Sequence, residues 1–162
     1  MPKAVAVAGV TFDPVTKSPV VVLRDPETGN VVPVWIGVLE ANAIVLALGG
    51  AEPPRPMTHD LLKSILHATE TRLGSVEITD IREGTYFALL HLEGNGKNVR
   101  VDARPSDAIA LALRCGARIL VSETVLAQSL IPATAASEGG ERDQWTELLE
   151  KMDPEQFSKY KM

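Results

Sequence analysis

Two stretches of the chain carry the same succession of patterns: three short segments typical of β-strands, separated by turn residues, and then one apolar segment typical of a helix. The strands are expected over residues 4–12, 19–24, 31–36, 75–81, 85–92 and 98–103, and the two helices over residues 38–48 and 105–115. Successive strands joined by tight turns pair antiparallel. The sequence therefore predicts an α+β fold, in which a mainly antiparallel sheet packs with helices that are buried almost all round.

The two halves align with each other at an offset of 65 residues. This alignment places the turn Gly29-Asn30 on Gly94-Asn95 and places Val34 on Val99. Glycine and asparagine accept the positive φ angles that tight turns require. The alignment predicts a repeated strand-strand-strand-helix unit, which suggests an internal duplication.

Further elements are expected between and after the two units. The proline-rich residues 53–56 exclude a helix there, and the next helix is expected to begin with Thr58 as its N-cap and to reach Arg72. After the second unit, residues 119–121 predict a short edge-like strand and residues 122–128 a last turn or helix.

The chain of 162 residues has the usual length of one domain, which we expect over residues 1–131. Residues 132–144 are small and polar and predict a flexible linker. Residues 145–162 predict a short amphipathic helical tail, because Trp145, Leu148, Leu149 and Met152 fall on one helix face. A helix this short is unstable alone, so it is expected to dock on its own domain or on a protein partner.

The cellular compartment is predicted from cysteine usage and from the absence of targeting patterns. Cys115 is the only cysteine, which excludes an intramolecular disulfide and argues for a reducing compartment. The N-terminus lacks the pattern of a signal peptide, and no apolar run is long enough to span a membrane. A soluble, cytoplasmic protein that does not associate with a membrane is therefore expected.

The net charge of −5 argues against a protein that coats nucleic acid, since phosphate contacts need Lys and Arg. Between Lys97 and Arg118, however, five basic side chains stand against two acidic ones. This excess indicates either a small phosphate-facing patch or an ordinary solvated face. Any binding of nucleic acid is expected to be weak.

The first candidate site lies at His59 and Asp60, at the start of the second expected helix. An imidazole beside a carboxylate can act as a general base with its orienting group, or as a pair of metal ligands, and the helix dipole favours a bound phosphate. Asp60 can equally well cap the first turn of the helix. Both roles are compatible with the sequence.

The second candidate site follows the strand over residues 98–103. Strand alternation sends Val99, Val101 and Ala103 to the core and Arg100, Asp102 and Arg104 to the opposite face. Asp102 and Asp107 flank the strand-to-helix turn and can share a divalent cation, while Arg104 can bind a phosphate. The alternatives are a ladder of surface salt bridges, and helix capping by Ser106 and Asp107.

Glu40 opens the corresponding helix of the first half, where it is either a partner of the helix dipole or a member of a site. Patterns specific to other chemistries are absent from the sequence. It has no glycine-rich phosphate loop, no Gly-x-Ser-x-Gly motif and no paired histidines at the spacing of a zinc site.

Three ordered motifs resemble the bifunctional nuclease (BFN) domain family: Val34–Gly37 with Glu40-Ala41, Arg55–Leu62, and Val101–Arg114. The resemblance covers roughly residues 4–130. It implies a nuclease that acts on RNA and DNA, and a compact α+β domain that associates as an oligomer, expected to be a dimer. The motif positions carried over to this chain are Glu40, His59, Asp60, Asp102, Arg104, Ser106 and Asp107.

The first functional hypothesis is therefore hydrolysis of the phosphodiester bonds of RNA or DNA. Mg²⁺ or Mn²⁺ would be held by Asp102 and Asp107, with Glu40 or Asp60 as a further ligand. His59 would activate water. The expected contacts to the substrate are Arg55, Arg100, Arg104 and Ser106, of which Arg55 and Arg104 would stabilise the developing negative charge.

The second hypothesis is a non-enzymatic regulatory or scaffolding oligomer, whose motif residues cap helices and whose C-terminal helix recruits a partner. A third possibility is a protein that binds a small phosphorylated ligand. Loss of cleavage on substitution of His59 would support the first hypothesis, whereas loss of stability without any cleavage would support the second.

Overall fold

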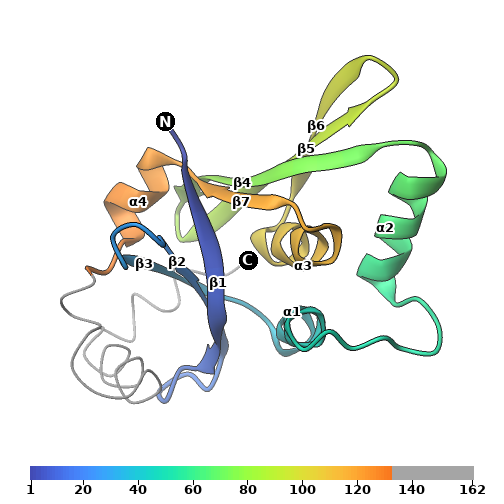
Figure 1. Ribbon diagram of the computed structural model, residues 1–162. Helices are drawn as coiled ribbons and strands as arrows, with labels where there is room; N and C mark the ends of the chain where they lie inside the picture. Colours follow the sequence, from blue (N-terminus) through green and yellow to red (C-terminus); the bar gives the residue numbers. More distant parts are fainter. Residues whose placement is uncertain (133–162) are drawn as a thin grey trace.

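The computed structural model describes residues 1–132, so the predicted linker from residue 133 on and the predicted tail helix lie outside the described residues. The elements in chain order are β1 (Lys3–Phe12), β2 (Pro19–Arg24), β3 (Val31–Trp35), α1 (Val38–Leu48), α2 (Thr58–Ala68), β4 (Arg72–Arg82), β5 (Thr85–Gly94), β6 (Lys97–Ala103), α3 (Pro105–Cys115), β7 (Arg118–Val121) and α4 (Glu123–Ser129). The strands form one sheet in the order β3-β2-β1-β7-β4-β5-β6 (Figure 1). Since β4–β7 is the only parallel pair among the described strands, the predicted α+β fold is confirmed.

Each half of the chain forms a three-stranded antiparallel meander followed by a helix, β1–β2–β3 before α1 and β4–β5–β6 before α3. The turns use the positive φ angles that the sequence indicated, 75° at Gly29 and 51° at Asn95. The two units therefore share a succession of elements, while their origin by duplication stays a prediction.

The position of β7 corrects the sequence analysis, which expected an edge-like strand. β7 lies inside the sheet, antiparallel to β1 and parallel to β4, and so joins the two meanders. Its side chains Ile119 and Val121 are buried. Four residues with one apolar face are compatible with either position, so only the long-range pairing decides between them.

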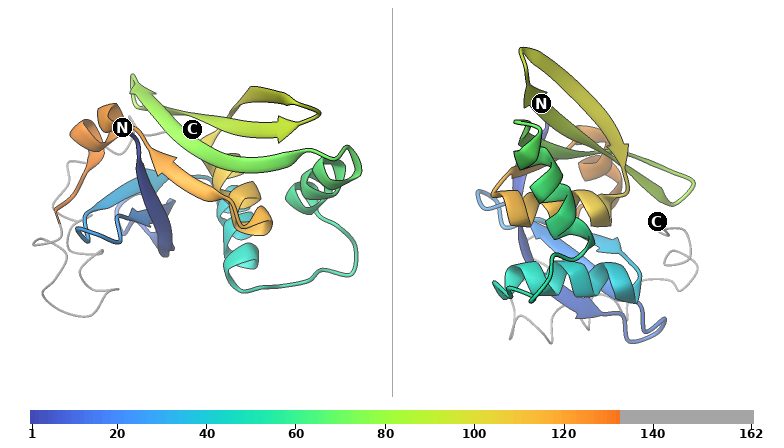
Figure 2. Two further views of the ribbon diagram at one scale, coloured as in Figure 1. Left: turned by 45° about the horizontal axis from the view of Figure 1, so that its top comes forward. Right: turned by 90° about the vertical axis from the view of Figure 1, so that its right-hand side faces the viewer.

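Helix α3 lies between the sheet and α1, and α2 packs beside it (Figures 1 and 2). Residues Ala108–Ala112 of α3 are all buried, as predicted for this helix. The same prediction is wrong for α1, in which only Ala41 and Ile44 are buried. Since α1 packs mainly on α3, β1 and β2, its outer face stays exposed, including the side chains of Val38, Leu39, Val45 and Leu48.

Helix α2 is shorter than predicted, and its N-cap lies one residue earlier than predicted. It ends at Ala68 rather than Arg72, because Glu70 takes a φ of 54° and Thr71 N donates back to Leu66 O. The N-cap is Met57 rather than Thr58, and Asp60 Oδ2 accepts a hydrogen bond of 3.0 Å from Met57 N.

None of the helices among residues 1–132 combines the length and apolar character that crossing a bilayer requires.

Strand β6 also departs from the prediction that Val99 and Val101 face the core. Their side chains are 49% and 39% exposed. β6 forms one edge of the sheet, and on the sheet α3 packs mainly against β4 and β5. The apolar face of the sheet therefore extends beyond the part that α3 covers.

Candidate active site

A hollow of about 380 Å³ lies where α1, α2 and the start of α3 meet. It brings together residues that are up to 75 positions apart in the chain. Its polar lining residues are Glu40, Asn42, Thr58, His59, Arg104, Asp107 and Arg114, and its apolar ones are Leu39, Ala43, Leu46 and Met57. A hollow in which polar groups converge beside apolar side chains is typical of a site that binds a small ligand or one unit of a polymer.

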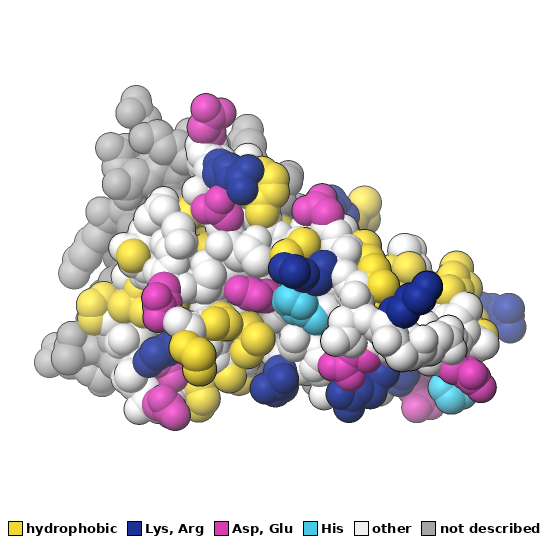
Figure 3. All heavy atoms as spheres, turned by 90° about the horizontal axis from the view of Figure 1, so that it is seen from above, with side chains coloured by type: hydrophobic (Ala, Val, Ile, Leu, Met, Phe, Trp, Pro, Cys, Tyr) yellow, Lys and Arg dark blue, Asp and Glu magenta, His cyan; other side chains and the backbone are white. Residues whose placement is uncertain are grey.

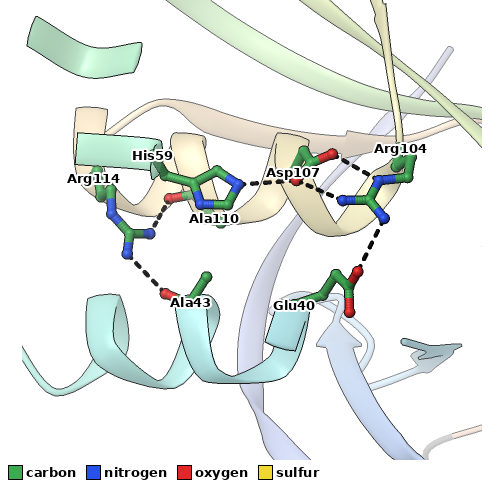
Figure 4. A network of polar contacts seen from close by, with 7 residues as sticks. All are labelled: Glu40, Ala43, His59, Arg104, Asp107, Ala110 and Arg114. Carbon is green, nitrogen blue, oxygen red and sulfur yellow. Dashed lines mark hydrogen bonds and ion pairs between the residues drawn. The ribbon is translucent and has the colours of Figure 1, made fainter. Parts of the chain in front are cut away.

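The central contact of the hollow joins His59 on α2 to Asp107 on α3. The imidazole Nε2 lies 2.9 Å from Asp107 Oδ1, and the His59 side chain is largely buried (Figure 4). Asp107 also accepts two hydrogen bonds from Arg104, 2.8 Å from Nε to Oδ2 and 3.2 Å from Nη2 to Oδ1. One carboxylate is thus held by a guanidinium on one side and by an imidazole on the other.

Arg104 extends this network to α1 by a hydrogen bond of 3.0 Å from Nη1 to Glu40 Oε1. Glu40 and Asp107 are each the third residue after the N-cap of their helix, which is Gly37 in α1 and Arg104 in α3. Carboxylates in the first turn are stabilised by the helix dipole. The helix-dipole and site interpretations of these residues therefore apply together.

We expect Gly37→Ala to move the Glu40 carboxylate away from Arg104. A Cβ at Gly37 would overlap Glu40 Oε2, while the backbone angles of Gly37 suit any residue. Because the blocking atom is the end of a flexible side chain, the free energy of unfolding should fall by less than about 1 kcal/mol. Urea unfolding of Gly37→Ala, Glu40→Gln and the double variant measures this. Additive effects of the two substitutions would contradict the shared mechanism.

Arg114, the side chain of which is 9% exposed, ties all three helices together. Its Nε donates to Asp60 Oδ1 on α2 at 2.9 Å. Its Nη1 donates to Ala110 O on α3 at 2.8 Å, and its Nη2 to Ala43 O on α1 at 3.0 Å (Figure 4). Asp60 is again the third residue after a helix N-cap. This arrangement fixes the N-terminus of α2, and with it His59, against α3.

The electrostatics of the network favour the ionised forms of Asp107 and Asp60. Burial opposes ionisation of Asp107, but hydrogen bonds from Arg104 and His59 outweigh it and hold the pKa of that carboxyl below its usual value. The hydrogen bond from Met57 N, followed by Arg114, lowers the pKa of Asp60. Asp107 and then Glu40 raise the pKa of Arg104 against the effect of burial. Arg104 and Arg114 are both paired with carboxylates.

The hydrogen bond to Asp107 also defines the tautomer of His59. An ionised carboxylate can only accept, so Nε2 carries the proton that it shares with Asp107. In the neutral imidazole, Nδ1 then has a lone pair, and within the described residues it forms no hydrogen bond. The histidine is thereby prepared to accept a proton at Nδ1.

Other residues predicted for the site lie outside the hollow. Arg55, Arg100 and Asp102 are exposed and do not line it. Ser106 is buried, and its Oγ has no hydrogen-bond partner within the described residues. Neither Ser106 nor Asp107 caps α3, because its N-cap, Arg104, receives no side-chain cap bond.

The residues present do not fit the predicted Mg²⁺ or Mn²⁺ site at Asp102 and Asp107. Both oxygens of Asp107 already bond to Arg104, and Asp102 lies on the exposed edge strand. Among residues 1–132, no group of three or more His, Cys, Asp and Glu side chains gathers as a metal site would require. Metal dependence stays a prediction.

Three of the polar lining residues, Asn42, Thr58 and Arg114, were not among the predicted site residues. The spacing of seven residues between Asp107 and Arg114, two helical turns, places both on one face of α3 and could have identified Arg114. Asn42, a polar residue within an apolar helix, gave a weaker indication.

The face of the described residues seen in Figure 3 has no continuous basic band. Lys and Arg side chains alternate there with Asp and Glu side chains. This distribution agrees with the overall net charge of −5 and indicates little non-specific attraction for a long polyanion.

Comparison with known proteins places this site in a family. Residues 21–134 match the family model described as bifunctional nuclease domain. An uncharacterized protein of Mycobacterium tuberculosis is 41% identical over 161 residues, which cover 94% of this chain and 96% of that protein. The protein named bifunctional nuclease 2 of Arabidopsis thaliana is 28% identical over 109 residues, 65% of this chain and 33% of that protein.

The protein named bifunctional nuclease 1 of Oryza sativa subsp. japonica is 30% identical over 104 residues, which cover 61% of this chain and 31% of that protein. The aligned part is thus about a third of each of these plant proteins. The match to the family model includes every residue of the network around His59 and Asp107. The chain belongs to the bifunctional nuclease domain family.

Proposed function

We propose that this chain hydrolyses phosphodiester bonds of RNA or DNA, with the scissile phosphate bound in the hollow between α1, α2 and α3. The observation that carries the proposal is the His59–Asp107 hydrogen bond of 2.9 Å, next to the guanidinium of Arg104. The names of the plant relatives support the same reaction class.

In this reaction His59 is the general base. Asp107 orients the imidazole and stabilises the positive charge that forms when Nδ1 takes a proton. The proton comes from a water molecule, the oxygen of which attacks phosphorus. The bond from phosphorus to one ester oxygen breaks, and the released oxygen takes up a proton from solvent. Water is the nucleophile that allows one site to cleave both polymers, because DNA lacks the 2′-hydroxyl group of RNA.

Arg104 stabilises the charge that develops on the phosphate oxygens. Its side chain is 50% exposed, and Glu40 and Asp107 fix its plane from two sides. Only one N–H each of Nη1 and Nη2 is used in these contacts, so the second N–H of each remains for a phosphate oxygen. A pre-oriented guanidinium stabilises a transition state without reorganisation.

Replacing His59 by glutamine should lower the rate of cleavage by at least about 100-fold, since a general base contributes this much or more. The rate is measured with labelled single-stranded RNA and DNA, with and without EDTA. His67→Gln is the matched control, because His67 is exposed on the same helix and does not line the hollow. Equal cleavage by wild type and His59→Gln would reject the proposal, and EDTA tests metal dependence separately.

The charge balance of the network favours a second candidate function, the non-enzymatic regulatory or scaffolding oligomer. The guanidinium groups of Arg104 and Arg114 are each paired with a carboxylate, and together they join α1, α2 and α3. A purely structural clamp would have this composition. If the network has only this structural role, His59→Gln should lower the stability of the fold, and neither wild type nor the variant should cleave nucleic acid. The partner of the tail helix and the cytoplasmic location stay predictions.

A further inference from the structure

The two edges of the sheet differ in how they are protected. β3 is buried along its whole length, contains Pro33, and forms a two-way backbone bridge with Ile131 through Val31. β6 has no proline and pairs with β5 without a register shift. No described residue pairs with its outer side. Natural sheets usually block such an edge, because its open backbone groups recruit another strand.

The side chains of β6 add to this exposure. Val99 and Val101 are aligned with Leu92 and Leu90 of β5, on the face that continues the core beyond α3. On the opposite face, Arg100 and Asp102 are exposed and make no hydrogen bond or ion pair within the described residues. The edge thus presents valines on one face and two unpaired opposite charges on the other.

The sequence of β6 is complementary to itself in one antiparallel register. When Val101 lies opposite Val101 of a second copy, Arg100 lies opposite Asp102 of that copy, and Asp102 opposite its Arg100. Moving the centre to residue 100 or to residue 102 places like charges opposite each other. A register centred midway between two residues places each valine opposite a charged residue of the other copy. The apolar face of one strand then lies on the same side as the charged face of the other.

We propose that β6 pairs with β6 of a second copy of this chain, in the antiparallel register centred on Val101. The contact has two-fold symmetry, so each favourable charge pair occurs twice. It extends the sheet continuously through both copies and covers the valines that α3 leaves exposed. The proposal does not depend on the chemistry of the hollow, although β6 leads directly into Arg104.

Charge reversal tests the register in the full chain by sedimentation velocity over a range of concentrations. Arg100→Asp and Asp102→Arg should each weaken the dimer by about tenfold or more, because each turns two attractive pairs into repulsive ones. The double variant Arg100→Asp/Asp102→Arg restores opposite charges and should recover the wild-type dissociation constant. Arg55→Asp and Glu52→Arg are matched controls, exposed residues in the loop between α1 and α2.

A cysteine at the symmetry axis provides a direct test. In the proposed register Val101→Cys faces itself at a Cα separation of about 5 Å, within the range of a disulfide. Arg100→Cys faces residue 102, and its own copy lies roughly 8 Å away, beyond that range. With an added oxidant, Val101→Cys should form a covalent dimer and Arg100→Cys should not.

Two results would overturn the proposal. One is a wild-type chain that stays monomeric over the whole concentration range. The other is a dimer that tolerates both single reversals and forms no disulfide at position 101, which would assign the contact to another surface such as residues 133–162. Melting temperatures of all variants, compared with that of wild type, show whether a lost dimer reflects a lost fold.

Discussion

Replacing Asp107 by asparagine should lower the rate of phosphodiester cleavage by about two to four orders of magnitude, comparable with the loss of the general base itself. The amide removes the charge that pairs with Arg104 and stabilises a protonated imidazole. If its NH₂ group turns toward His59, Nε2 must accept, and the proton moves to Nδ1, where it blocks proton abstraction. Single-turnover cleavage by wild type and Asp107→Asn measures the effect.

Asp102→Asn is the matched comparison for this prediction, because Asp102 is exposed and outside the hollow. An unchanged rate for Asp102→Asn is expected if the His59–Asp107 pair carries the reaction. A loss as large as that of Asp107→Asn would instead favour the metal pair predicted from the sequence.

The same substitution should change how stability depends on pH. The pKa of Asp107 is lowered in the folded chain, so its ionised form stabilises the fold above the unfolded pKa of about 3.9. This contribution is lost as the pH falls through the lower folded pKa. The difference in free energy of unfolding between wild type and Asp107→Asn should therefore shrink from pH 7 to pH 3. A difference that grows on acidification would contradict the assignment of the charged network.

The elements that could be predicted from the sequence are those that local patterns determine. The strands of both meanders and α3 follow from alternation, turn glycines and helix periodicity, which act within a few residues. The exposure of α1, the exposed face of β6 and the internal position of β7 depend on what packs against each element. No pattern within the element itself contains that information.

The site was predictable in its members but not in their contacts. His59 and Asp107 were both candidates from their positions at helix starts, yet the hydrogen bond between them spans 48 residues of sequence. Asp102 was paired with Asp107 because the two are close in the sequence. The strand holds Asp102 at the sheet edge, whereas α3 directs Asp107 into the hollow, so proximity along the chain was the wrong guide.

The largest expected effect on the free energy of unfolding comes from replacing Arg114. Arg114→Met should lower the free energy of unfolding by about 3 kcal/mol, because it removes one donor each from the Asp60 carboxylate and from two backbone carbonyls. The Asp60 side chain is 29% exposed, so water replaces part of the lost contact, and this keeps the effect below that of a fully buried pair.

Arg114→Lys separates the contribution of the hydrogen-bond geometry of Arg114 from the contribution of its charge. Lysine keeps the positive charge but lacks the planar fork that reaches three helices, so we expect it to recover less than half of the loss. Arg118→Met, at an exposed position without a partner in the described chain, should change stability by less than about 0.5 kcal/mol. Urea unfolding measures all three variants. Full recovery by lysine would mean that charge alone, rather than the joining of α1, α2 and α3, makes Arg114 important, and His59 would then need another support for its position against Asp107.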